Sequence, residues 1–243
     1  MPKTVTVALI ALALMGSRGH AQELDFIFVE SPTLLPTYVQ VPDGFDRNRT
    51  YSVVVALHGF GASPQTFLDA TRDIARAGYI LASVAAPYQF RVDDSLVGYD
   101  WSYRHLNQAA VSQRATQLSV DYIVAAVAGL RTSYQIDKVF LLGFSQGGAF
   151  SYLASSVHPE VIDGLIALGS RFDPAWFEGR PPSDFPVFIG HGERESERSV
   201  AGAHAARDYL QGAGHDVTLR MYDVGHDVPR EMVAGIIEWL GMR

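Results

Sequence analysis

The stretch KVFLLGFSQGG, residues 138–148, joins an apolar run to a glycine-rich turn, and a helical pattern follows over 146–157. The apolar run predicts a strand that is buried on both faces. Gly143 and Gly147 lack a Cβ, so the chain can turn sharply at Ser145, between the strand and the helix. This unit of strand, turn and helix predicts a sheet that is covered by helices.

Short apolar runs alternate with helical patterns along the rest of the chain. Strands are predicted at 35–41, 51–57, 79–85, 138–144, 164–169, 186–190 and 217–222. Helices are predicted at 64–77, 112–134, 146–157, 200–210 and 229–240, whereas 87–108 is expected to be irregular. This alternation predicts an α/β fold with a mostly parallel central sheet and helices on both faces.

Composition narrows the class of protein. The chain has 243 residues, of which 48% are hydrophobic and 19% charged, as in ordinary globular proteins. It holds no cysteine, which excludes disulfides, thiolate metal sites and a cysteine nucleophile. The formal net charge is −7 and no basic run occurs, so nucleic acid is not expected as a partner.

Residues 1–21 have the layout of a secretory signal peptide. Lys3 supplies the positive start, residues 5–15 form the apolar run, and small residues surround the expected cut after Ala21. The apolar run is shorter than the roughly 20 residues that span a bilayer, so no transmembrane anchor is expected. We therefore predict a cleaved peptide, a single mature domain at 22–243, and a periplasmic or extracellular location.

The turn after the strand 138–144 carries the pattern G-x-S-x-G. In open parallel sheets, catalytic side chains lie beyond the carboxyl ends of the strands. A serine in a strained turn between a strand and a helix exposes its Oγ, which suits a nucleophile. We predict Ser145 as the nucleophile and the N–H of Gln146, at the start of the helix, as a donor to an oxyanion. The alternative is a glycine-rich turn without chemistry.

A second glycine-containing loop, His58-Gly59-Phe60-Gly61, follows the predicted strand 51–57. Its glycines let the loop fold closely around a carbonyl oxygen, and the N–H of Phe60 is the expected second oxyanion donor. His58 is interpreted as fixing the loop by hydrogen bonding. No H-E-x-x-H pattern or second nearby histidine indicates a metal site, so no metal ion is expected.

An acid and a base are predicted after the last two strands. His226 lies between the last predicted strand and the last predicted helix, so we predict it as the general base. Glu193, Glu195 and Glu197 follow the strand 186–190. An acid there can orient an imidazole and stabilise its protonated form. Glu195 is the predicted acid and Glu197 the alternative; the remaining glutamates fit a solvated, charged turn.

Four segments carry a family resemblance: LHGFGAS (57–63), GFSQGG (143–148), HGERE (191–195) and GHDVP (225–229). Together they resemble the phospholipase/carboxylesterase branch of the α/β-hydrolases. The resemblance extends to dienelactone-hydrolase-like proteins and to secreted polymer or feruloyl esterases. It implies the α/β-hydrolase fold, a Ser–acid–His triad in the order Ser145, Glu195, His226, ester substrates and no cofactor. Members usually have H-G-x-x-D, and Glu195 occupies the aspartate position here.

These features together predict a serine carboxylic ester hydrolase, which would act on a small-molecule or polymer ester through an acyl-enzyme on Ser145. Trp101, in the aromatic-rich segment 87–108, is a candidate substrate wall; alternatively, these aromatic side chains pack the segment onto the domain. Two other hypotheses are an inactive binding module with this fold and hydrolysis of peptide, thioester or lactone bonds. The sequence does not predict the oligomeric state.

Overall fold

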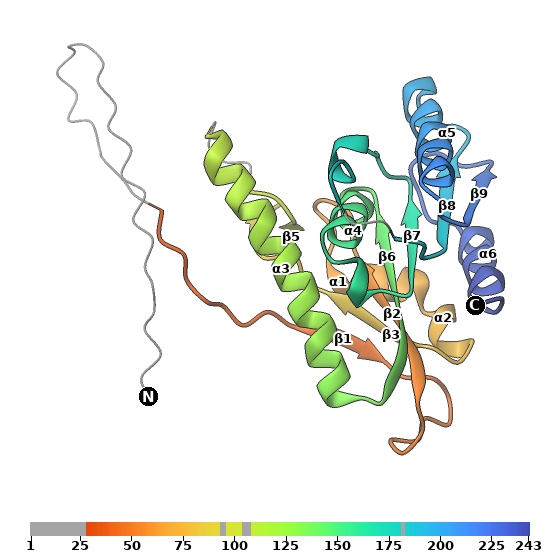
Figure 1. Cartoon of the computed structure of the whole chain (residues 1–243). Helices are drawn as coiled ribbons and strands as arrows, with labels where there is room; N and C mark the ends of the chain where they lie inside the picture. Colours follow the sequence, from red (N-terminus) through yellow and green to blue (C-terminus); the bar gives the residue numbers. More distant parts are fainter. Residues whose placement is uncertain (1–27, 93–95, 104–107, 181–182) are drawn as a thin grey trace, which may run out of the picture. The chain divides into compact units, whose positions relative to one another are not determined.

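A seven-stranded sheet forms the centre of residues 35–243 (Figure 1). Its strands are β1 (Thr37–Gln40), β2 (Tyr51–Leu57), β3 (Ile80–Val84), β6 (Ile136–Phe144), β7 (Gly164–Leu168), β8 (Val187–Gly192) and β9 (Val217–Tyr222). They are arranged in the order β1-β3-β2-β6-β7-β8-β9. Only β1 is antiparallel to its neighbour, and the other five pairs are parallel. The mostly parallel sheet expected from the sequence is therefore confirmed.

The computed structural model describes residues 28–92, 96–103, 108–180 and 183–243. Residues 28–34 belong to a unit separate from 35–243, and they contain neither helix nor strand. The predicted signal peptide, residues 1–21, lies outside the described residues. Within the described part of the chain, no helix combines the length and the apolar character that crossing a membrane requires.

Helices cover both faces of the sheet (Figure 1). They are α1 (Pro64–Thr71), α2 (Asp73–Arg76), α3 (Ala109–Ser133), α4 (Gln146–Val157), α5 (Glu197–Gly212) and α6 (Arg230–Leu240). Helices α3, α4 and α5 pack on one face, and α1, α2 and α6 pack on the other. The two helical layers explain why the inner strands β2, β3, β7 and β8 read as continuous apolar runs, since both faces of these strands are largely buried.

Successive side chains of β2 show this burial directly. Val53 and Val55 point into the core beneath α3 and α4, whereas Val54 points into the core beneath α1, α2 and α6. All three side chains are completely buried. Because side chains alternate between the faces of a strand, a strand without polar residues is stable only between two covering layers.

The first predicted helix begins as expected and ends differently. Ser63 caps α1, its Oγ accepting the N–H of Thr66 at 3.2 Å, and Pro64 occupies the first turn. The predicted single helix 64–77 is divided at Arg72 into α1 and α2. Arg72 keeps helical backbone angles, with φ −55° and ψ −25°, so the division is slight.

Two elements within 87–108 differ from the prediction of irregular structure. Residues Tyr88–Arg91 (β4) and Val97–Asp100 (β5) form an antiparallel hairpin separate from the main sheet. Each strand has four residues, which is too short for alternation to give a clear sequence signal. The hairpin is joined to the loop after β2, because the N–H of Gly61 donates to the carbonyl of Tyr99 at 3.0 Å.

The prediction of Trp101 as a substrate wall is wrong. Its side chain is completely buried and packs against the ring of Phe150. Its indole N–H donates to the carbonyl of His58 at 2.9 Å. Trp101 therefore packs the hairpin segment onto the domain, as a large aromatic group with one polar atom does when both its surface and its donor are satisfied in the core.

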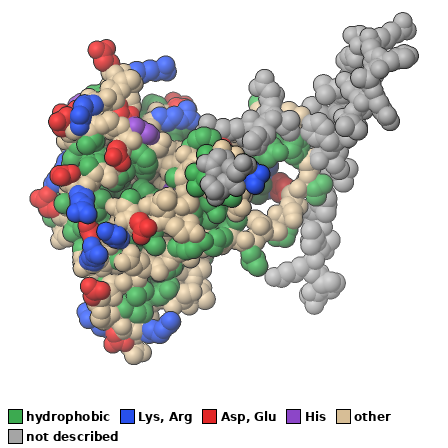
Figure 2. All heavy atoms as spheres, turned by 180° about the vertical axis from the view of Figure 1, so that it is seen from behind, with side chains coloured by type: hydrophobic (Ala, Val, Ile, Leu, Met, Phe, Trp, Pro, Cys, Tyr) green, Lys and Arg blue, Asp and Glu red, His purple; other side chains and the backbone are tan. Residues whose placement is uncertain are grey.

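Charged side chains of both signs are intermixed on the face seen from behind in Figure 2, with apolar side chains between them. The described part of this face therefore has no extended patch of one charge.

Candidate active site

Ser145 lies at the sharp turn between β6 and α4. Its backbone angles are φ 55° and ψ −115°, and among the described residues it is the only residue other than glycine with a positive φ. Such a conformation costs about 1–3 kcal/mol, and it persists only where the surroundings hold it. Here the N–H of Ser145 donates to the carbonyl of Leu168 at 2.8 Å, and α4 begins at the next residue.

Two glycines make room for this turn. A Cβ on Gly143 would overlap the carbonyl of Gly147, and a Cβ on Gly147 would overlap the carbonyl of Leu57. The overlapping atoms are backbone atoms, which cannot move aside without distorting β2 or α4. The pattern G-x-S-x-G is therefore a steric requirement of this turn.

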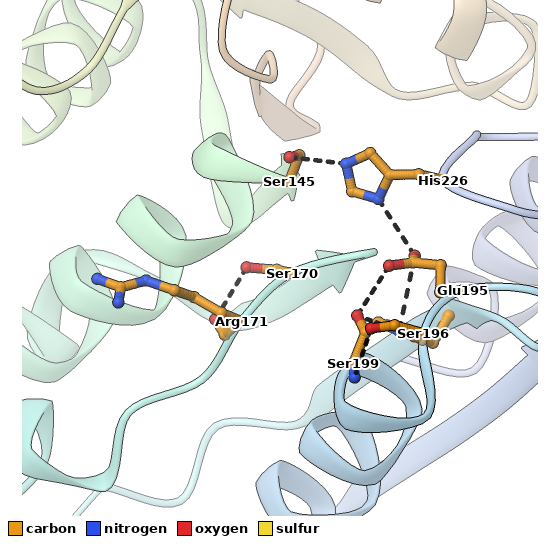
Figure 3. A network of polar contacts seen from close by, with 8 residues as sticks. Ser145, Ser170, Arg171, Glu195, Ser196, Ser199 and His226 are labelled. Carbon is orange, nitrogen blue, oxygen red and sulfur yellow. Dashed lines mark hydrogen bonds and ion pairs between the residues drawn. The ribbon is translucent and has the colours of Figure 1, made fainter.

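His226 lies in the loop between β9 and α6, with its imidazole directed at Ser145 (Figure 3). Its Nε2 lies 2.8 Å from the Oγ of Ser145. The ring also packs against the ring of Phe144, with 4.8 Å between the ring centroids. About half of the His226 side chain is exposed, so the imidazole is accessible from solvent.

Glu195 lies on the other side of the imidazole, in the loop between β8 and α5. Its Oε1 is 3.2 Å from the Nδ1 of His226, and the Glu195 side chain is only 10% exposed. Glu193 and Glu197 are exposed. The structure thus brings Glu195, and neither neighbouring glutamate, beside the imidazole.

Backbone contacts hold the loops of Glu195 and His226 together. The N–H of Glu193 donates to the carbonyl of Tyr222 at 2.7 Å, and the N–H of Arg194 donates to the carbonyl of Val224 at 2.9 Å. A Cβ on Gly192 would overlap the carbonyl of Gly225. Because β8 and β9 are parallel neighbours, their carboxyl ends place both loops at the same edge of the sheet.

Gly169, at the end of β7, is a site residue that sequence reasoning missed. It has a positive φ of 49°. A Cβ there would lie 3.3 Å from the Oε1 of Glu195 and 3.4 Å from the Cε1 of His226. Gly169 therefore leaves space for the carboxylate and the imidazole to meet. The sequence signal that could have identified Gly169 is its position directly after the strand that follows the G-x-S-x-G turn.

The loop after β2 approaches the nucleophile closely. A Cβ on Gly59 would lie 3.3 Å from the Cβ of Ser145. Phe60, the next residue, is half-exposed and stacks on Phe90 of β4, with 5.1 Å between ring centroids. On the other side of Ser145, Gln146 is the first residue of α4, so its N–H has no partner within the helix.

The side chain of Gln146 ties α4 to the end of β5. Its Nε2 donates to the carboxylate of Asp100 and, at 3.0 Å, to the Oγ of Ser102. Its Oε1 accepts the N–H of Trp101 at 3.2 Å. Asp100 is almost completely buried. Sequence reasoning did not find this contact, since it joins residues about 45 positions apart.

His58 is completely buried beneath the loop that it precedes. Its Nδ1 lies 2.8 Å from the carbonyl of Gly59, and its Nε2 accepts the N–H of Ala86 at 3.2 Å. This pattern requires a neutral ring that is protonated on Nδ1. Burial lowers the pKa of His58 to about 4, although the hydrogen bond to Gly59 opposes the shift. These contacts agree with the interpretation that His58 fixes the loop.

The buried His58 predicts a loss of stability in mild acid. In the unfolded chain the imidazole has a pKa near 6.5, so between pH 6.5 and 4 it binds a proton that the folded protein excludes. We expect this group alone to lower the free energy of unfolding by about 3 kcal/mol over that range. Urea unfolding at several pH values measures it, with His58→Gln as the variant that lacks the titration. Equal pH slopes in the two proteins would contradict the assignment.

The described residues contain no group of three or more His, Cys, Asp or Glu side chains arranged to hold a metal ion. The site brings together a serine hydroxyl, an imidazole and a carboxylate, and each group contacts the next. Such a set can transfer a proton from the hydroxyl and stabilise the charge that forms on the imidazole.

Comparison with known sequences places the chain in a family. The sequence profile of the phospholipase/carboxylesterase family matches residues 45–242, which include all of the loops described above. The chain belongs to this family.

Feruloyl esterase B of Thermothelomyces thermophilus is 26% identical over 156 residues, which cover 60% of this chain and 47% of that protein. Acyl-protein thioesterase 1 of Gibberella zeae is 31% identical over 104 residues, covering 40% of this chain and 44% of that protein. The chain thus spans less than half the length of these curated relatives. The crystal structure of esterase PE8 superposes with a TM-score of 0.72 at 20% identity, covering 86% of this chain and 99% of that one. The α/β-hydrolase fold is therefore confirmed for this member of the phospholipase/carboxylesterase family.

Proposed function

We propose that the protein is a serine carboxylic ester hydrolase, with Ser145 as nucleophile, His226 as base and Glu195 as the acid that orients the base. The observation that carries the proposal is the continuous contact from Ser145 Oγ to His226 Nε2 at 2.8 Å and from His226 Nδ1 to Glu195 Oε1 at 3.2 Å. Membership of the phospholipase/carboxylesterase family supports the same reaction class.

In the proposed mechanism, the Nε2 of His226 takes the hydroxyl proton of Ser145 as Oγ attacks the carbonyl carbon of the ester. The carbonyl oxygen becomes an oxyanion, to which the N–H groups of Phe60 and Gln146 donate. The carbon–oxygen bond to the alcohol then breaks, and His226 gives its proton to the departing oxygen. Water releases the acyl group from Ser145 by the same proton transfers.

The surface beside Ser145 supports an ester with an apolar acyl or aromatic group. Phe60 and Phe90 form a stacked pair in which Phe60 is half-exposed, and Phe60 directly follows Gly59, which packs closely against Ser145. Aromatic faces bind apolar and planar groups through burial and ring stacking. A module that only binds ligands has no need of a strained serine in contact with an imidazole, which argues against the inactive alternative.

The test is hydrolysis of p-nitrophenyl esters of increasing acyl length, of methyl ferulate and of an acyl thioester by residues 22–243. We expect turnover of at least one ester class and loss of that turnover when Ser145 reacts with a fluorophosphonate probe. The most rapidly cleaved compound identifies the acyl group and separates oxygen esters from thioesters. Absence of turnover with all three classes, in folded protein, would refute the proposed function.

The proposal includes export from the cytoplasm, which rests on the sequence of residues 1–21. We expect the exported protein to begin at Gln22. N-terminal sequencing of protein recovered from the periplasm or the medium tests this. Recovery of the intact chain beginning at Met1, in the cytoplasm, would contradict it.

A further inference from the structure

The carboxylate of Glu195 has further partners besides His226, and one of them, Ser199, binds its second oxygen (Figure 3). The Oγ of Ser199 donates to its Oε2 at 2.8 Å. The Nε2 of His191 lies 3.1 Å from the Oγ of Ser199 and 3.6 Å from the Oε1 of Glu195. Neither Ser199 nor His191 takes part in the mechanism described above.

The protons available on these groups determine which group donates each hydrogen bond. A carboxylate accepts hydrogen bonds and has no proton to donate, so the single hydroxyl proton of Ser199 points at Glu195. The Ser199 oxygen then accepts from His191, which requires a proton on the Nε2 of His191. The result is a chain of donors that runs from His191 through Ser199 to Glu195.

His191 is suited to a neutral role in this chain. Its side chain is completely buried, and its Nδ1 has no hydrogen-bond partner among the described residues. Burial lowers the pKa of His191, against the opposing attraction of Glu195. A second proton on Nδ1 would be buried without an acceptor, so His191 donates through Nε2 as a neutral ring.

We propose that Ser199 and His191 are positioning residues that hold the Glu195 carboxylate against His226, an inference that rests on the proposed function. A glutamate has three side-chain torsions, so one contact to His226 leaves its carboxylate free to rotate away. The hydrogen bond from Ser199 to Oε2 fixes the second oxygen and thereby directs Oε1 at the imidazole. His191 in turn fixes the orientation of the Ser199 hydroxyl.

Ser199 lies in the first turn of α5. Ser196 caps the helix, and its Oγ accepts the backbone N–H of Ser199 at 3.3 Å. Glu195 and Ser199 are four residues apart around the first helical turn, a spacing that brings their side chains together. The same turn offers a matched control, because Ser196→Ala also removes one hydroxyl, and the Ser196 hydroxyl binds the backbone of Ser199.

The experiment compares Ser199→Ala, Ser199→Thr and Ser196→Ala on the best ester substrate. We expect Ser199→Ala to lower kcat about tenfold or more with KM unchanged, as loss of a hydrogen bond to a charged group does. Ser199→Thr keeps the hydroxyl and should restore most of kcat. Ser196→Ala should lower the melting temperature and leave kcat near that of the unchanged protein. An equal fall of kcat in Ser196→Ala would overturn the proposal, because the helix start would then be responsible.

A second measurement tests whether Ser199 acts through Glu195. In a Glu195→Ala background, Ser199→Ala should have no further effect on kcat, because the group that it positions is absent. An additive tenfold loss in that background would overturn the proposal. If Glu195→Ala itself retained normal kcat, the assignment of Glu195 would fail with it, and the single variant would show that the fault lies in the proposed function.

Discussion

Replacement of Ser145 with alanine is expected to lower kcat about 10⁶-fold and to leave KM for the ester little changed. The hydroxyl is the atom that forms the acyl-enzyme, and its Oγ is 2.8 Å from the Nε2 of His226. The side chain contributes little to packing because it stands clear of the backbone at the end of β6. The measurement is kcat on the best p-nitrophenyl ester, with circular dichroism to show that the variant is folded.

Ser170 provides a matched control for this loss. It lies at the same edge of the sheet, one residue after Gly169, and its Oγ donates to the carbonyl of Arg171 at 3.0 Å (Figure 3). Ser170→Ala should therefore retain kcat within about twofold of the unchanged protein, since surface substitutions have small effects. Turnover by Ser145→Ala at more than about a hundredth of the normal rate would rule out an acyl-enzyme on Ser145.

Replacement of Glu195 with glutamine is the second large effect that we expect, a fall in kcat of about 10⁴-fold. Glutamine has nearly the shape of glutamate but no charge, so it cannot stabilise the imidazolium that forms when His226 takes the proton of Ser145. Its NH₂ group can also face Nδ1 of His226 and favour the wrong tautomer. The loss should appear in kcat, with KM and the melting temperature little changed.

Glu197→Gln is the control for this variant, because it removes the same charge two residues away. Glu197 is the exposed first residue of α5. We expect its replacement to change kcat less than about twofold and to weaken the helix start slightly through the loss of an acidic residue. If instead Glu197→Gln caused the larger fall in kcat, the assignment of the acid to Glu195 would be wrong.

The sequence by itself determined those parts of the protein in which a local constraint, such as burial or steric crowding, allows only one structure. Continuous apolar runs predicted β2 and β6 because a strand between two helical layers has no polar face. The pattern G-x-S-x-G located the turn at Ser145, since only glycine fits where backbone carbonyls crowd it. The resemblance to the phospholipase/carboxylesterase branch, now confirmed as family membership, came from the same loops.

Contacts between distant segments were decided only by the tertiary structure. Glu193, Glu195 and Glu197 all follow one strand, and in the sequence only the family resemblance favoured Glu195. The packing of the β8 and β9 loops directs Glu195 at His226 and leaves Glu193 and Glu197 in solvent. Trp101 lies in an aromatic-rich segment, which suggested a substrate wall. In the structure it is buried and packs against Phe150, which is far along the chain. Gly169 matters because of atoms that reach it from the loops of Glu195 and His226. Periodicity reports which face of an element is buried, whereas a site depends on which elements meet, and that is fixed by the order of strands in the sheet.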